Sequence, residues 1–252
     1  MSDSTKHHSA LCSDMEAPKP SVWQNSCGSY KKIAIITAIT GRMDEVKFLP
    51  EQIKESPLIQ IDRHHFNDLQ VPVELRKLNK RQQALYFKQQ FFHIVPGYDV
   101  YIWIDGKIQV DSPTFVEQCL KALGDGELAI LKHGERDCVY DELNYIIQKT
   151  EAGSEYFVRR FAYRLKILKR DMEFMRGRGY PEKAGLHDCS IMVWRNTEQN
   201  INLAGAWWAT CKEYDGFDQV VIHELSHLVK QKIQPIVFEP GSFHLVKHLK
   251  VQ

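Results

Sequence analysis

The stretch that decides the fold is "YDVYIWIDGKIQV", residues Tyr98 to Val110. Within it, Val100–Ile104 is a near-continuous apolar run of β-branched and aromatic residues, which predicts a strand buried on both faces of a sheet. Asp105 and Gly106 end this run. A carboxylate directly after a buried strand lies at the edge where α/β proteins commonly bind their ligands. The stretch therefore predicts an α/β fold with a site at Asp105.

The segments on both sides of this stretch alternate between strand and helix patterns. Strands are predicted at 33–37, 57–62, 69–75, 127–133, 189–195 and 233–239, and helices at 79–95, 112–123, 138–149, 155–175, 197–214 and 216–231. Strands that alternate with helices are typical of a mostly parallel sheet flanked by helices. We therefore expect one α/β domain of Rossmann-like organisation over residues 30–252. Residues 1–29 are polar and contain Ser and Pro, which predicts a flexible tail.

The composition is that of an ordinary globular protein. The chain has 252 residues, of which 43% are hydrophobic and 26% are charged, and its formal net charge is +1. This near-neutral charge argues mildly against nucleic acid as a partner. The six cysteines include no C-x-x-C pair, so we expect reduced structural thiols and a cytoplasmic location. We find neither a secretory h-region nor an apolar run of about 20 residues, so we expect no transmembrane segment.

A second motif, "HELSH" at His223 to His227, matches the pattern H-E-x-x-H. On a helix, two histidines four residues apart share one face and can hold a zinc ion, while the glutamate acts as base on zinc-bound water. A zinc metallopeptidase is therefore one hypothesis. It needs a third ligand, for which the following segment offers Glu239, His244 and His248. The alternative is an ordinary packed helix.

Five segments form an ordered set that covers most of the predicted domain. They are "TAITGRMDE" (37–45), "YDVYIWIDGKIQV" (98–110), "ILKHGERDCVYDE" (130–142), "GYPEKAGLHDCSIMVWRN" (179–196) and "WWATCKEYDGFDQVVI" (207–222). In this set the chain resembles the TOD1/MUCI70 glycosyltransferase-like family, a former domain of unknown function. Three positions depart from the family pattern. Asp188 and Thr210 stand where the family often has Glu, and Phe217 stands where it has Arg.

The resemblance implies a GT-A-like fold and the activity of a glycosyltransferase. Such an enzyme moves a sugar from a nucleotide-diphosphate donor to a hydroxyl of a glycan, a lipid or another acceptor. Many of these enzymes neutralise the diphosphate with Mn²⁺ or Mg²⁺ held by an Asp-x-Asp pair. Here the pair reads Asp105-Gly106-Lys107, so one carboxylate remains and Lys107 could contact phosphate directly. A catalytically silent nucleotide-sugar binding module is a third hypothesis.

The resemblance and the residue chemistry together give the candidate site residues. The catalytic candidates are the carboxylates Asp218 and Asp188. Candidates for binding the donor nucleotide are Asp105, Gly106, Lys107, Arg136, Thr37, Lys88, His133 and Asp137, and candidates for a metal ion are Asp105 and His244. Arg136 and Asp137 could instead form a structural ion pair. For Arg81 we expect solvated surface, and for Trp207 and Trp208 a place in the core.

Overall fold

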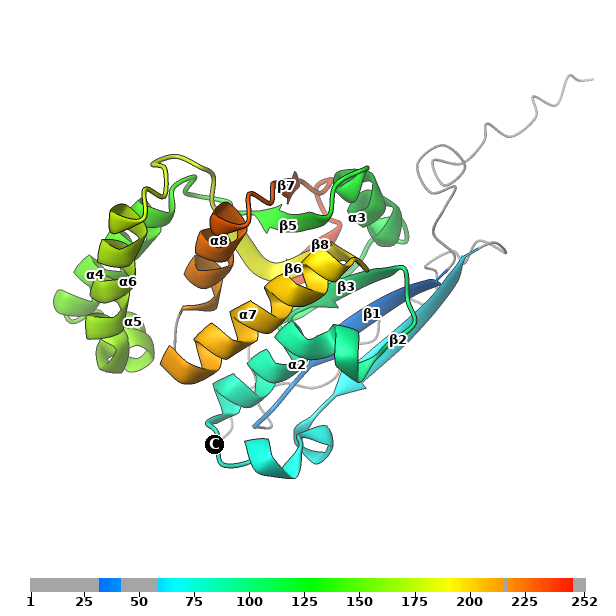
Figure 1. The fold of residues 1–252 in the computed structure, drawn as a ribbon, viewed down its shortest axis with the longest axis horizontal. Coiled ribbons are helices and arrows are strands. Elements are labelled where there is room, and N and C mark those ends of the chain that lie inside the picture. Colours follow the sequence, from blue (N-terminus) through cyan, green and yellow to red (C-terminus); the bar gives the residue numbers. More distant parts are fainter. Residues whose placement is uncertain (1–31, 42–58, 215–216, 247–252) are drawn as a thin grey trace, which may run out of the picture.

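A six-stranded sheet forms the centre of the molecule (Figure 1). The computed structural model describes residues 32–41, 59–214 and 217–246. The sheet has the order β2-β1-β3-β6-β5-β7. Its strands are β1 (Lys32–Ala38), β2 (Gln60–Phe66), β3 (Val100–Ile104), β5 (Leu128–Lys132), β6 (His187–Arg195) and β7 (Ile233–Ile236). β6 runs antiparallel to both neighbours, whereas the other pairs are parallel. An α/β fold with a mostly parallel sheet is therefore confirmed.

Helices cover both faces of the sheet. They include α2 (Lys80–Ile94), α3 (Phe115–Leu123), α7 (Glu198–Tyr214) and α8 (Asp218–Leu228). Tyr101 and Trp103 of β3 point into the core under α2, α7 and α8. Val100, Ile102 and Ile104 point into the opposite core, under α3. Because successive strand residues face opposite sides, a strand covered on both faces needs an apolar residue at every position, as in β3.

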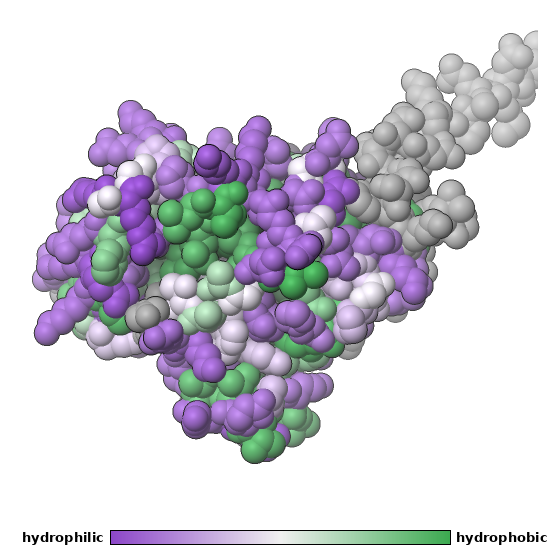
Figure 2. Space-filling model, in the orientation of Figure 1, coloured by the Kyte–Doolittle hydropathy of each residue, from purple (hydrophilic) through white to green (hydrophobic). Residues whose placement is uncertain are grey.

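Three further helices form a separate helical lobe beside α8. The helical lobe consists of α4 (Val139–Glu151), α5 (Glu155–Phe161) and α6 (Leu165–Gly177), with the short 3-10 helix η3 (Ala162–Arg164) between the last two. These helices enclose a third core, to which Phe217 and Val220 contribute. Figure 2 shows apolar side chains over α8 and hydrophilic side chains over much of the lobe. α8 therefore packs against both the sheet and the lobe.

A small second sheet follows β3 and fixes the turn that contains Asp105. It pairs β4 (Ile108–Val110) with β8 (Phe243–Leu245) in antiparallel register. Lys107, which immediately precedes β4, accepts the backbone N–H of Val246 at 2.8 Å. β8 has no counterpart among the predicted strands, because it is three residues long and its pairing partner is more than 130 residues earlier in the chain. A pairing strand so distant along the chain leaves no pattern in the sequence around β8.

The prediction of a strand at 69–75 is wrong. The segment forms two 3-10 helices, η1 (Asp68–Gln70) and η2 (Val73–Leu75). Asn67 begins η1 with a capping box, in which its side chain accepts from Leu69 N at 2.8 Å and its own N–H donates to the side chain of Gln70 at 2.9 Å. Local side-chain hydrogen bonds of this kind compete with strand pairing, and Pro72 has no N–H to donate to a neighbouring strand.

The helix predicted at 155–175 is divided into α5, η3 and α6, and the other predicted elements are present with shifted ends. β2 continues to Phe66, four residues past its predicted end, because all seven of its residues pair with β1. The four described cysteines, 119, 138, 189 and 211, are buried and free, as expected for structural thiols. The predicted tail at 1–29 lies outside the described residues, and one domain over 30–252 stays a prediction. Among the described residues, no helix combines the length and apolar character that a membrane span requires.

Candidate functional site

The candidate site lies at the carboxyl ends of β1 and β3, where the strand order reverses. β1 pairs with β2 on one side and with β3 on the other, and the crevice at such a reversal is the usual ligand site of open α/β sheets. Asp105 follows β3 and donates its N–H to the carbonyl of Ser190 at 2.8 Å. A Cβ on Gly106 would lie 2.5 Å from Cγ1 of Ile39, so the close approach of the two strand ends requires glycine.

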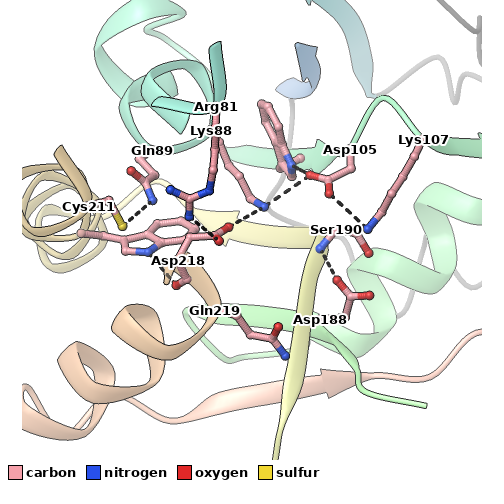
Figure 3. A network of polar contacts seen from close by, with 12 residues as sticks. Arg81, Lys88, Gln89, Asp105, Lys107, Asp188, Ser190, Cys211, Asp218 and Gln219 are labelled. Atoms are coloured by element: carbon pink, nitrogen blue, oxygen red, sulfur yellow. Dashed lines mark hydrogen bonds and ion pairs between the residues drawn. The ribbon is translucent and has the colours of Figure 1, made fainter. Parts of the chain in front are cut away.

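Lys88 of α2 lies between two carboxylates that are far apart in the sequence. Its Nζ is 3.3 Å from Oδ1 of Asp105 and 3.3 Å from Oδ2 of Asp218 (Figure 3). The Lys88 side chain is 7% exposed, whereas those of Asp105 and Asp218 are 26% and 16% exposed. The end of β3 and the start of α8 are therefore joined through one buried ammonium group.

Asp218, the first residue of α8, is held by side chains from two other helices. The guanidinium of Arg81 donates to its Oδ1 at 3.2 Å, and the indole N–H of Trp207 donates to its backbone carbonyl at 2.9 Å. Arg81 and Lys88 are two helical turns apart on α2 and so project from the same face. The expectation that Arg81 is solvated surface is therefore wrong. Trp207 is fully buried, as expected.

Asp105 has two further neighbours. The indole N–H of Trp103 donates to its Oδ1 at 2.7 Å, and Nζ of Lys107 lies 3.7 Å from its Oδ2. The side chains of Lys107 and Arg81 are 31% and 30% exposed, so a ligand can reach both of them. We call Arg81, Lys88, Asp105, Lys107 and Asp218 the Lys88 cluster.

Mutual electrostatics shift the pKa values of two members of the Lys88 cluster. Burial by itself would lower the pKa of Lys88, but the carboxylates of Asp105 and Asp218 raise it well above its ordinary value. Burial would raise the pKa of Asp218, but Lys88 and Arg81 hold it well below its ordinary value. Both groups are therefore charged throughout the neutral pH range.

His244, one of the two expected metal ligands, is paired with Asp111. Nδ1 of His244 lies 2.6 Å from Oδ2 of Asp111, and the His244 side chain is 59% exposed. No three described His, Cys, Asp or Glu side chains are grouped to hold a metal ion. Mn²⁺ and Mg²⁺ prefer octahedral oxygen ligands, but the carboxylate oxygens of Asp105 face an indole N–H and two ammonium groups. This donor set does not fit a divalent cation.

Asp188 lies at the start of β6, between Asp105 and a cavity at the same edge of the sheet. Its Oδ1 accepts the backbone N–H of Ser190 at 2.9 Å. β6 lies between β3 and β5, and Asp188 is in register with Leu131 near the carboxyl end of β5. The segments 131–134 and 236–243 line a cavity of about 430 Å³. By strand order Asp188 is therefore placed between the Lys88 cluster and this cavity, next to the lining residue Leu131 but not itself in the lining.

Three of the predicted donor-binding residues lie in a separate turn after β5. Nδ1 of His133 accepts the backbone N–H of Arg136 at 3.0 Å. Arg136 forms an ion pair with Glu142, and its guanidinium lies 4.3 Å from the ring centre of Tyr145. Asp137 is exposed. Arg136 thus forms structural ion pairs, but its partners are Glu142 and Glu135 and not Asp137.

His223 of the H-E-x-x-H motif is packed inside the protein. It is 2% exposed, its Nδ1 lies 2.6 Å from the carbonyl of Gln219, and its Nε2 lies 3.0 Å from Nδ1 of His187. The carbonyl requires Nδ1–H of His223 as donor, and in a neutral ring Nε2 then accepts from Nδ1–H of His187. Burial lowers the pKa of His223 to about 4. Burial, with His223 beside it, lowers the pKa of His187 to about 3.

The other two residues of the motif do not complete a zinc site. Glu224 forms an ion pair with Arg178 at 2.5 Å. His227 is exposed, and its ring lies 5.3 Å from that of Tyr180. A grouping of three ligands for zinc is also missing from the part of the chain that the structure describes. The motif therefore belongs to a packed helix.

Sequence reasoning missed Trp103 and Arg164. Trp103 lies in an apolar run, where an aromatic residue indicates core. Arg164 is 2% exposed, its guanidinium lies 5.8 Å from the ring centre of Phe217, and it interacts electrostatically with Asp218. Arg164 belongs to a segment rich in Arg and Lys, where no signal marks one of them. Thr37 is half-buried within β1.

Comparisons with known proteins give a distant likeness among solved structures, only at the level of the fold. No family model matches the chain, and no curated protein matches it. Among solved structures, the chain is similar to mouse xyloside xylosyltransferase 1 in its apo form, with a TM-score of 0.42 and 11% sequence identity over 81% of this chain and 84% of that chain. That protein is a glycosyltransferase by name. At this distance, the function of the present chain has to be argued from its own residues.

Proposed function

We propose that this protein is a glycosyltransferase that takes a sugar from a nucleotide-diphosphate donor. The observation that carries the proposal is the Lys88 cluster, in which cations and carboxylates converge at the carboxyl edge of the sheet. Ammonium and guanidinium groups bind phosphate, and carboxylates accept hydrogen bonds from sugar hydroxyls. The five segments that resemble a glycosyltransferase-like family support the same activity, and the α/β sheet suits the GT-A-like fold which that resemblance implies.

The proposed reaction develops negative charge on the leaving group. The bond between the anomeric carbon of the sugar and the β-phosphate oxygen breaks, and a bond from that carbon to the acceptor oxygen forms. The nucleoside diphosphate leaves with the bonding electrons, and the acceptor hydroxyl gives its proton to a base. Cations held in place before the reaction stabilise such charge. In this proposal Lys107 and Arg81 contact the diphosphate, while Asp105 accepts a hydrogen bond from a donor hydroxyl.

The cavity beside Asp188 is the proposed acceptor site. Lys132, His133 and Glu239 give it polar groups, and Phe238 and Phe243 give it an apolar wall. Such a combination suits a sugar ring, which presents both hydroxyls and C–H faces. Because Asp188 lies at the start of β6, between this cavity and the Lys88 cluster, it is the proposed base for the acceptor proton.

Asp218 has a positioning role in this proposal. Its pKa lies well below the ordinary value, and a general base works best with a pKa near the operating pH. A carboxylate that holds its ion pairs so firmly is a weak base at neutral pH. Its contacts with Lys88 and Arg81 instead fix the two side chains of α2 against the end of β3.

The experiment that tests the proposed function measures nucleoside diphosphate released from a panel of UDP-, GDP- and ADP-sugars, with and without a mixture of glycan acceptors. We expect release from one nucleotide class, stimulated by acceptor. Asp188→Asn should reduce the rate roughly 100-fold, as expected for loss of a general base, without weakening donor binding. The matched control is Asp141→Asn, because Asp141 is exposed on α4; its rate should equal that of the wild type.

Two results would contradict this proposal. Donor binding without any release would reduce the protein to a silent nucleotide-sugar binding module. Failure of every nucleotide sugar to bind would remove the donor site itself.

A further inference from the structure

We propose that cationic side chains, led by Lys107 and Arg81 with Lys88 behind them, neutralise the donor diphosphate without a divalent metal ion. This inference rests on the proposed function and concerns the same site. It departs from the Mn²⁺ or Mg²⁺ that the family resemblance implies, and the reason is the donor set around Asp105.

The carboxylate of Asp105 is already surrounded by groups that a metal ion would displace or repel. Its Oδ1 accepts from Trp103 Nε1 at 2.7 Å and lies 3.3 Å from Lys88 Nζ. Its Oδ2 lies 3.7 Å from Lys107 Nζ. A divalent ion on either oxygen would stand beside an ammonium group, and charges of the same sign at such distances repel strongly in a partly buried site.

The Lys88 cluster offers no second carboxylate that could offset this repulsion by helping to hold a divalent ion. The position that completes the Asp-x-Asp pattern is Lys107, a cation. Asp218, the other carboxylate of the cluster, is itself bound by Arg81 at 3.2 Å and by Lys88 at 3.3 Å. Each carboxylate therefore already has its counter-charges, and neither has the two open oxygens that a hard cation requires.

The same geometry leaves positive charge available to phosphate. The Lys88 cluster contains three cations and two carboxylates, and two of the three cations reach solvent. Arg81 and Lys107 are about one-third exposed, whereas Lys88 is 7% exposed. The two outer cations can exchange a carboxylate partner for a phosphate partner, since both are charge-assisted hydrogen bonds, and the Arg81 guanidinium can bind phosphate through two N–H groups. Lys88 stays in place between the two carboxylates.

This inference makes a prediction about Asp105 that is opposite to that of a metal site. Asp105→Asn removes a negative charge beside the phosphates but keeps a side-chain oxygen for Trp103. We therefore expect the variant to bind nucleoside diphosphate at least as tightly as the wild type. If Asp105 held a metal ion, the same variant would lose the binding.

The test is calorimetric titration of chelator-treated protein with UDP, GDP and ADP, once in EDTA and once in Mn²⁺. We expect one nucleotide to bind with the same affinity in both buffers. Lys107→Met and Arg81→Met should each weaken that binding at least roughly tenfold, since each removes a cation that forms charge-assisted hydrogen bonds with phosphate. Both side chains are partly exposed, so the variants should fold, which far-UV circular dichroism checks. Lys121→Met, an exposed lysine on α3, is the matched control and should bind as the wild type does.

The outcomes separate this inference from the proposed function. Binding in Mn²⁺ that is lost in EDTA and in Asp105→Asn would overturn the inference and leave the transferase standing. Metal-independent binding that neither Lys107→Met nor Arg81→Met weakens would also overturn it, because the phosphates would then lie elsewhere. If no nucleotide binds in either buffer, the proposed function fails together with the inference.

Discussion

Two polar clusters include residues of α8, about one and a half turns apart, and they are opposite in character. Asp218 belongs to the Lys88 cluster, whose members carry charge and whose outer cations reach solvent. His223 pairs with His187 in a buried contact with ring centres 5.2 Å apart. In the first cluster two cations, Arg81 and Lys107, are open to a ligand from solvent. In the second, the ring nitrogens that meet are satisfied by each other and by the carbonyl of Gln219.

This difference shows what a motif can and cannot establish. H-E-x-x-H specifies where two histidines lie on a helix, but it says nothing of which groups surround them. Here the surroundings of His223 are neutral and closed. Asp218 stands in no metal-ligand motif, yet it lies where α2, α7 and α8 meet the end of β3. A candidate site is therefore better judged by the charged groups around it and their access to solvent than by the spacing of residues in a motif.

The largest expected effect comes from removing the ammonium group at the centre of the Lys88 cluster. Lys88→Met leaves the carboxylates of Asp105 and Asp218 partly buried without their shared partner. Breaking a buried ion pair from one side costs about 3–5 kcal/mol, so the free energy of unfolding should fall by about that amount. Urea unfolding followed by tryptophan fluorescence measures it. The control, Lys121→Met, should change the free energy by less than about 0.5 kcal/mol. If Lys88→Met and Lys121→Met changed the free energy of unfolding equally, Lys88 would not hold the two carboxylates as we describe.

An effect of similar size is expected from acid on the neutral histidine pair. The pKa values of His187 and His223 are lowered to about 3 and about 4, from 6.5 in the unfolded chain. Between pH 6.5 and about 4 the unfolded state therefore binds more protons, and stability falls as the pH falls. Each histidine should cost about 2.5–3 kcal/mol of stability across this window, so we expect the pair to cost about 5 kcal/mol, measured by urea unfolding at a series of pH values.

The two clusters should lose their contributions to stability in different pH ranges, so acid can distinguish them. Asp218 has a lowered pKa, so its contribution to stability is lost only as the pH falls below 3.8, its value in the unfolded chain. The double variant His187→Phe, His223→Phe should remove most of the slope between pH 6.5 and 4. A slope that survives in the double variant would show that other groups cause it.

The fold could be predicted where the pattern is local. The apolar run of β3 and the amphipathic helices around it depend on the residue sequence within each element, so their existence and type are confirmed. The 3-10 helices at 68–75 were missed because the capping box of Asn67 outweighs an apolar pattern that resembles a strand. β8 was missed because its pairing partner, β4, is distant in the chain.

Only part of the site could be predicted, because only some of its residues stand in a recognisable local pattern. Asp105, Lys107, Lys88 and Asp218 were candidates and are brought together by the fold. His133 and Arg136 instead belong to a turn with its own hydrogen bonds. Arg164 reaches Asp218 from a different lobe, and such a contact depends on packing between elements that no spacing rule describes.

The measurement that tests the central claim most directly is a thermal-shift assay of chelator-treated protein against nucleoside diphosphates, nucleotide sugars and Zn²⁺. A ligand at about 100 times its Kd stabilises the native state by about 2.7 kcal/mol, which raises the midpoint by about 5–10 °C for a chain of this size. We predict such a rise with one nucleotide class, unchanged in EDTA, and none with Zn²⁺. No rise with any nucleotide and a large rise with Zn²⁺ would contradict the account, and would make the histidines of α8 the functional site instead.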